Sequence, residues 1–260
     1  MVKSINYYLN LFGFYPKKLK ASFKGIPFFL KNKSKIKKQI KSYNFEFKIT
    51  SIYPCLNDRF DKAGNLPLHY FYQDLFVANR IFKNKPVKHV DIGSRIDGFA
   101  AHIASFREIE IFDIRELKDE IKNIIFIQAD LMDENFKMEN YCDSISSLHA
   151  IEHFGLGRYG DKVDIAGHIK GLNNIYKLLK TGGKFYFSTP IGKQRIEFDA
   201  HRVFSVKYLL QLFKEKYKIE SFSYVNDKND FFENVSLTDE MIEKNFLCNY
   251  GCGIFEMTKV

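Results

Sequence analysis

The sequence lacks tryptophan and contains only six prolines and four cysteines. No secretory signal peptide precedes the cysteines, so we expect Cys55, Cys142, Cys248 and Cys252 to be reduced intracellular thiols. The pair Cys248 and Cys252 has no second pair to complete a zinc site. No stretch approaches the roughly 20 uninterrupted apolar residues that span a bilayer. The sequence therefore predicts a soluble, cytoplasmic protein.

Positive charge is in excess, with a formal net charge of +9 over 260 residues. Much of it lies in one run, at Lys31, Lys33, Lys35, Lys37, Lys38 and Lys41. Three interpretations remain open: a solvated helix face, peripheral contact with anionic membrane or glycolipid at the inner face of the membrane, or nucleic-acid binding. Apolar residues between the lysines predict that residues 1–84 form a helical, aromatic N-terminal extension that packs on the domain following it.

The stretch from Val87 to Asp113 is the most informative part of the chain. It contains an apolar strand, Asp91, a glycine turn from Gly93 to Gly98, a helix, and a second strand that ends near Asp113. An acidic residue about 20 positions beyond the first glycine lies where a carboxylate accepts both hydroxyls of an adenosine ribose. The order predicts a pocket for an adenosine cofactor.

The glycine turn favours one such cofactor over another. Arg95 stands where a dinucleotide fold has its second glycine, and Asp97 adds negative charge where a pyrophosphate would rest. S-adenosylmethionine has no pyrophosphate, and its ammonium and sulfonium groups favour acidic neighbours. The residues therefore favour S-adenosylmethionine over NAD.

The motifs that follow resemble, in order, those of the class I S-adenosylmethionine-dependent methyltransferases over roughly residues 85–260. The matching segments are Asp91 to Gly93, Asp113, Ala129 to Leu131, Leu148 to His153, and Leu178 to Gly183. Tyr70 to Asp74, Asp91 to Arg95 and Gly155 to Asp161 resemble a branch of that superfamily known only as a domain of unknown function. The resemblance implies an α/β, Rossmann-like fold with a seven-stranded, mostly parallel sheet whose last strand is antiparallel.

The same resemblance implies which residues contact the cofactor, with S-adenosylhomocysteine as the product. They are Asp91, Gly93, Ser94, Arg95, Gly98, Asp113, Ile114, Asp130, Leu131 and His149. We predict Asp113 at the ribose and Asp130 at the adenine amino group.

Methyl transfer to a hydroxyl needs a group that takes the proton, and histidine or a desolvated carboxylate suits that role. The candidates lie after the fourth and fifth strands: His153, Asp161, His168 and His201. For Asp161 and His168 the alternatives are a helix cap and a surface residue, and for His201 a loop anchor.

Polar side chains in the same loops predict a hydrophilic acceptor. The candidate substrate-binding residues are Glu152, Arg158, Tyr159, Arg202 and Gln73. The leading hypothesis is O-methylation of a small-molecule or glycan acceptor, such as a sugar, nucleotide-sugar or phosphorylated group. Its destination would be a surface polysaccharide, as is typical of such enzymes.

Two other hypotheses remain open. The first is a non-catalytic module that acts as a partner or membrane-surface adaptor through its basic N-terminus. The second, ranked lower, is a nucleic-acid methyltransferase; the chain lacks the Asn/Asp-Pro-Pro-aromatic motif of amino-group nucleobase methylases. We expect no nucleic-acid partner and no metal, and the sequence does not indicate the oligomeric state.

Overall fold

The computed structural model describes residues 5–43, 46–61 and 69–260 and divides the chain into two compact units, Met1–Leu66 and Pro67–Val260. The first unit contains the helices α1 (Ile5–Leu11) and α2 (Pro16–Tyr43) and a short 3-10 turn (Asp58–Phe60). Gly25 is the buried residue of α2, because the backbone of Leu56 packs directly against it. Residues 1–4, 44–45 and 62–68 of the predicted extension lie outside the described residues.

The second unit contains both strands and helices, as the expected α/β fold requires. Its helices are α3 (His69–Asn84), α4 (Ala101–Ala104), α5 (Gly167–Leu178), α6 (Val206–Phe213) and α7 (Asp239–Glu243). Its strands are β1 (His89–Ile92), β2 (Ile109–Asp113), β3 (Ile124–Gln128), β4 (Cys142–Leu148), β5 (Leu179–Ile191), β6 (Arg195–Glu197), β7 (His201–Val203), β8 (Tyr217–Val225), β9 (Phe231–Phe232) and β10 (Gly251–Lys259).

The main sheet has the order β3-β2-β1-β4-β5-β10-β8-β9. Strands β1 to β5 pair in parallel, and β10 is antiparallel to both β5 and β8. The predicted seven-stranded, mostly parallel sheet with an antiparallel last strand is therefore confirmed. The two-residue strand β9 extends one edge, and β6 pairs with β7 in a separate hairpin.

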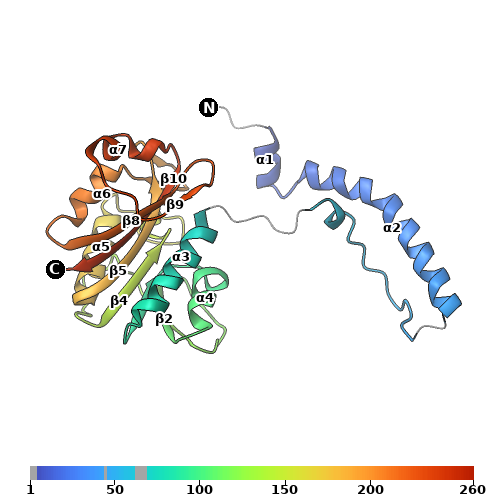
Figure 1. Ribbon diagram of the computed structural model, residues 1–260, viewed down its shortest axis with the longest axis horizontal. Helices are drawn as coiled ribbons and strands as arrows, with labels where there is room; N and C mark the ends of the chain where they lie inside the picture. Colours follow the sequence, from blue (N-terminus) through green and yellow to red (C-terminus); the bar gives the residue numbers. More distant parts are fainter. Residues whose placement is uncertain (1–4, 44–45, 62–68) are drawn as a thin grey trace. The chain divides into compact units, whose positions relative to one another are not determined.

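Helices cover both faces of the main sheet, with α3 and α4 on one side and α5 and α6 on the other (Figure 1). Successive side chains of a strand therefore enter different cores: Ile111 packs with Val77 and Phe99, whereas Phe112 packs with Ile145 and Leu172. This double burial explains why all four residues of β1 and all five residues of β2 are buried.

The predicted domain boundary at residue 84 is wrong by one helix. Val77, Ala78 and Ile81 of α3 are buried in the core shared with Phe99 and Ile103, so the helix belongs to the second unit. That the remaining extension packs on the sheet domain stays a prediction.

Helix α5 ends at Leu178, and β5 begins at the next residue, Leu179. Gly182 still makes a tight turn with φ of +78°, as expected of glycine. The pairing of β4 with β5 is interrupted over this turn, because Cys142 pairs with Leu179 and Ser144 with Lys184.

Candidate functional site

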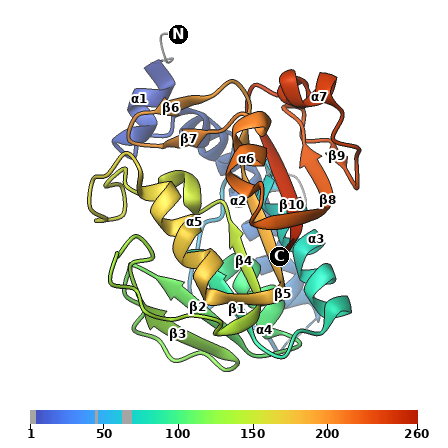
Figure 2. The ribbon, with the colours of Figure 1, turned by 90° about the vertical axis from the view of Figure 1, so that its left-hand side faces the viewer.

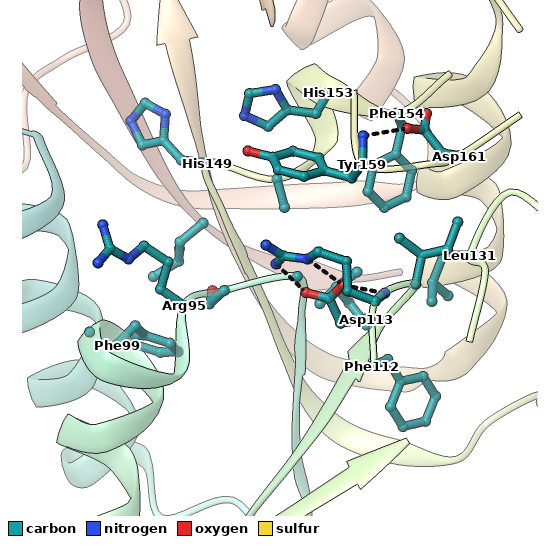
Figure 3. A pocket seen from close by; sticks show the side chains of 18 of the residues that line it. Arg95, Phe99, Phe112, Asp113, Leu131, His149, His153, Phe154, Tyr159 and Asp161 are labelled. Atoms are coloured by element: carbon teal, nitrogen blue, oxygen red, sulfur yellow. Dashed lines mark hydrogen bonds and ion pairs between the residues drawn. The ribbon is translucent and has the colours of Figure 1, made fainter. Parts of the chain in front are cut away.

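A cavity of about 260 Å³ opens at the carboxyl ends of β1, β2, β3 and β4, where ligands bind in open α/β sheets. Its walls come from α3, the glycine turn after β1, the ends of β2 and β3, and the segment from Leu148 to Asp161 (Figure 3). Figure 2 shows how β1, β2 and β4 run side by side toward this edge of the sheet.

The glycine turn is shaped by backbone geometry and by one buried carboxylate. Gly93 has φ of +75°, and a Cβ atom there would lie 3.0 Å from the Cβ of Ala150. The backbone N–H and the hydroxyl of Ser94 each donate to Asp91 at 2.9 Å, and the Ser146 hydroxyl donates to it at 2.5 Å. Asp91 is fully buried and does not line the cavity, so in the structure it positions the turn; burial raises its pKa to about 7.

The charged residues of the turn pair with each other. Arg95 donates to both carboxylate oxygens of Asp97, at 3.0 and 2.7 Å, and both side chains are mostly exposed. Both residues also line the cavity, as do Ser94 and Gly98. Arg95 occupies the position where a dinucleotide-binding turn has its second glycine. Because Asp97 balances its charge, the turn carries no net charge from this pair.

Asp113, at the end of β2, is 8% exposed and lines the cavity, but another side chain already engages it. Arg115 donates to its two oxygens from Nε at 2.9 Å and from Nη2 at 2.5 Å, and the Arg115 backbone N–H donates at 2.8 Å. The guanidinium also lies 4.8 Å from the centre of the Tyr159 ring. Figure 3 shows Asp113 in the middle of the view, below Tyr159.

The end of β3 supplies a mainly apolar wall. Asp130 accepts from the backbone N–H of Met132 at 2.8 Å through one oxygen, which fixes the orientation of its carboxylate. Leu131, Phe112 and Phe154 line the cavity beside it, together with Ile114. An apolar wall with one oriented carboxylate suits a flat heterocycle that carries an amino group.

His149, directly after β4, lines the cavity and points away from Asp113. Its Nδ1 lies 2.7 Å from the Glu152 carboxylate, and both side chains are buried. Glu152 does not line the cavity. In the structure its carboxylate orients the His149 ring and also accepts from Thr189 at 3.4 Å.

His153 lines the cavity next to Tyr159, with ring centres 5.2 Å apart. Its Nδ1 lies 2.7 Å from the Ala200 carbonyl oxygen. A carbonyl oxygen only accepts, so Nδ1 carries the proton and Nε2 keeps its lone pair. Burial lowers the pKa of His153, which keeps the ring neutral to a lower pH than usual.

Asp161 also lines the cavity, but its oxygens are used to hold the loop. They accept from the backbone N–H groups of Gly155 at 2.7 Å, Gly157 at 3.2 Å and Tyr159 at 3.2 Å. Asp161 therefore closes the loop on itself and places Tyr159 over the cavity. From the sequence, the alternative role of Asp161 was a helix cap. In the structure Asp161 does accept from backbone N–H groups, but these belong to a loop and not to a helix.

Four other predicted residues lie outside the cavity lining: His168, His201, Arg158 and Arg202. His168 is not a surface residue, since it is buried and its Nε2 lies 2.8 Å from the Tyr208 hydroxyl. Arg202 is buried too, and donates to the carbonyls of Glu152, Phe154 and Ile165. In the structure its guanidinium therefore joins the segment after β4 to the segment that precedes α5.

His201 and Arg158 also have partners outside the cavity. His201 packs against Tyr250 with ring centres 5.2 Å apart and lies 3.6 Å from a Glu197 oxygen. Arg158 donates to the Ala200 carbonyl at 3.1 Å. Of the predicted substrate-binding residues, Gln73 and Tyr159 line the cavity.

The sequence reasoning missed several residues of the lining. Tyr70 was missed, although it lies one helical turn before Asp74 on α3, and Asp74 was expected with Gln73 at the pocket edge and does line the cavity. Arg115 and Phe154 were missed as well. Nothing in the local sequence indicates that Arg115 folds back onto Asp113.

Comparisons with known proteins agree with this architecture. The family model described as "Caenorhabditis protein of unknown function, DUF268" matches residues 87–249. The crystal structure of the 4+2 cyclase SpnF is similar with 13% identity and a TM-score of 0.52, covering 83% of this chain and 86% of that one. A Haemonchus contortus phosphoethanolamine N-methyltransferase, solved with phosphomonomethylethanolamine and S-adenosylhomocysteine, is similar with 16% identity and a TM-score of 0.50. It covers 75% of this chain and 55% of that one.

No curated protein matches the chain. The structural likenesses confirm the class I methyltransferase fold. They do not decide the reaction, because SpnF shares the fold and is described as a cyclase.

Proposed function

We propose that this chain, which belongs to the DUF268 family, is an S-adenosylmethionine-dependent methyltransferase that methylates a hydroxyl group of a hydrophilic acceptor. The observation that carries the proposal is the arrangement around one cavity of a strand-end carboxylate, a close-packed glycine turn and a neutral histidine: Asp113, Gly93 and His153. The first two fit a cofactor and the third fits an acceptor.

The cavity fits S-adenosylmethionine at three places. Gly93 has no side chain, so a ligand can approach the backbone there. A Cβ atom at this position would be in close contact with Ala150. Asp113 offers a carboxylate to the ribose hydroxyls, and Asp130 with Leu131 suits the adenine. When bound, the cofactor supplies an electrophilic methyl carbon on a sulfonium. The S-adenosylhomocysteine in the Haemonchus structure supports this choice of ligand.

His153 is the residue we propose as general base. The Ala200 carbonyl holds its Nδ1–H, so the lone pair on Nε2 is available for the acceptor proton. Because burial lowers its pKa, the ring is neutral at physiological pH. Asp161 and Tyr159 hold the loop that positions the acceptor, and positioning alone supplies much of the rate of such a displacement.

Polar groups at the cavity support a hydrophilic acceptor. Tyr159 is 38% exposed, and Arg95, Asp97 and Arg115 place both signs of charge around the same cavity. We propose a sugar, a nucleotide-sugar or a phosphorylated group, with surface polysaccharide as its destination.

The test is a screen of nucleotide sugars and sugar phosphates with S-adenosylmethionine, with S-adenosylhomocysteine and the methylated acceptor detected by mass spectrometry. His153→Ala should lose turnover and keep cofactor affinity, whereas His102→Ala, a change at an exposed position, should keep both. A His153→Ala enzyme with wild-type kcat would refute the assignment of the base. Cofactor binding with no turnover on any acceptor class would favour the non-catalytic module.

For the N-terminal unit we propose contact with an anionic membrane surface. None of the described helices is both long and apolar enough to cross a membrane. Helix α2 carries many lysines, and Leu19, Phe23 and Leu30 on it are exposed. Binding to phosphatidylglycerol vesicles but not to phosphatidylcholine vesicles, lost on deletion of residues 1–45, would support this contact. Equal binding by the deleted protein would refute it.

A further inference from the structure

Three metal-ligating side chains from distant parts of the sequence meet beside the cavity. They are His69 at the start of α3, His149 after β4, and Cys252 on β10. One ligand atom from each lies within 4.8 Å of the other two, and all three residues are buried, with exposed fractions of 6%, 7% and 0%. Neither the proposed methyl transfer nor the packing of the core requires such a group.

His149 is oriented as metal-bound histidines usually are. Its Nδ1 is held by the buried Glu152 carboxylate at 2.7 Å, and a carboxylate behind a histidine fixes the ring and raises its basicity as a ligand. Its other nitrogen, Nε2, is buried and makes no hydrogen bond of ordinary geometry among the described residues, and the Cys252 thiol is the group that interacts with the ring from β10. A buried polar atom without a partner is costly, and a bound cation would satisfy it.

The backbone and the neighbouring rings also hold this arrangement. His149 has φ of +51°, a left-handed conformation that is uncommon for a residue other than glycine and that occurs often at functional sites. The His69 ring stacks on the His149 ring at 5.5 Å, and Tyr70 and Tyr250 pack against the two histidines at 5.0 and 5.4 Å. The aromatic wall limits how far the two imidazoles can turn.

We propose that His69, His149 and Cys252 bind one zinc ion, with Glu152 as the residue that orients His149. Two imidazoles and one thiolate suit Zn²⁺, which binds nitrogen at about 2.0–2.1 Å and sulfur at about 2.3 Å. Tetrahedral bonds of that length place ligand atoms roughly 3.5 Å apart, so no pair of these atoms, all within 4.8 Å of one another, needs to approach by more than about 1.3 Å. This replaces the expectation of no metal, which rested on sequence spacing.

Three protein ligands leave the fourth position to water or to a ligand atom, as in catalytic zinc sites. His149 and Tyr70 line the cavity, so the zinc would lie at the cavity wall. The ion would also link α3 to β10 and to the end of β4.

The first experiment measures zinc binding to the full-length protein after removal of metal with a chelator. Calorimetry and elemental analysis should give one zinc per chain with submicromolar affinity. Cys252→Ser should weaken binding at least hundredfold. Cys248→Ser is the matched control, because Cys248 is also buried and lies outside the group. Glu152→Gln should weaken binding by about 10- to 100-fold.

A second measurement reports the ligands directly. Cobalt(II) in place of zinc should give a thiolate-to-cobalt charge-transfer band that disappears in Cys252→Ser and in His69→Gln and persists in Cys248→Ser. Circular dichroism and thermal melting of the metal-free variants show whether each one folds.

Two results would overturn the proposal. One is the absence of stoichiometric zinc in the wild type. The other is a folded Cys252→Ser protein that binds zinc as the wild type does.

Discussion

The pairing of Asp113 with Arg115 predicts opposite effects of two substitutions on cofactor binding. In the structure the guanidinium occupies both oxygens of the carboxylate that we assign to the ribose hydroxyls. The ribose hydroxyls of the cofactor therefore compete with Arg115 for this carboxylate. Arg115→Met should tighten binding, because the apolar part of the side chain remains and the competing charge is lost, and Asp113→Asn should weaken it.

The expected changes in Kd follow from how far the Arg115 and Asp113 side chains are exposed to solvent. The Arg115 side chain is 47% exposed, and an ion pair so open to solvent contributes about 0.2–1 kcal/mol, so its removal should lower Kd by at most about fivefold. The Asp113 side chain is 8% exposed, and hydrogen bonds to a charged group contribute about 1.5–3 kcal/mol. Asp113→Asn should then raise Kd by roughly 10- to 100-fold.

Calorimetric titration with S-adenosylhomocysteine measures both effects. In an Asp113→Asn background, Arg115→Met should no longer tighten binding, because no carboxylate remains to compete for. An Arg115→Met protein that binds tenfold more weakly would refute the reasoning, since it would make Arg115 a contact of the cofactor. Unchanged affinity in Asp113→Asn would refute the ribose assignment.

Three further predictions concern pH and the acceptor loop. Because burial lowers the pKa of His153, the acid limb of the kcat profile should lie below pH 6.5, with activity falling as pH falls through that pKa; a limb above pH 7 would contradict this. Burial lowers the pKa of His168 from 6.5 to about 4, so the unfolded chain takes the proton first, and stability present above pH 6.5 is lost as pH falls toward 4. The share of this loss due to His168 between pH 7 and 5 should be roughly 2 kcal/mol by urea denaturation, and His168→Gln should reduce the loss by that amount. Gly155→Ala should lower both stability and kcat, because φ is +75° and its Cβ would meet the Asp164 carbonyl oxygen at 1.9 Å. Gly160→Ala, with φ of +82° and nothing within 4 Å, should cost only about 1–2 kcal/mol, and equal effects of the two changes would contradict the packing argument.

The sequence predicted the sheet and the cofactor side of the cavity because those signals are local. An apolar strand, a glycine with positive φ and an acidic residue at the next strand end follow each other within 27 residues, and the structure brings Gly93 and Asp113 to one cavity. The apolar residues of α3 recur at helical spacing, which is also a local signal.

The acceptor side was harder to predict, because its polar residues have partners that the local sequence does not show. Arg202 and His168 are polar residues near the loops, yet both are buried and bonded to distant groups. His69 and Cys252 form no motif, and they meet only because α3 packs against β10. A sequence pattern reports a residue's neighbours in the chain, whereas these roles depend on neighbours in space.

The most direct test of the central claim is calorimetric titration of the purified protein with S-adenosylmethionine and S-adenosylhomocysteine, with NAD as the control. The account predicts micromolar binding of the first two ligands and none of NAD, because the turn at Arg95 and Asp97 does not suit a pyrophosphate. Failure of both sulfur-containing ligands to bind, or binding of NAD with similar affinity, would contradict it.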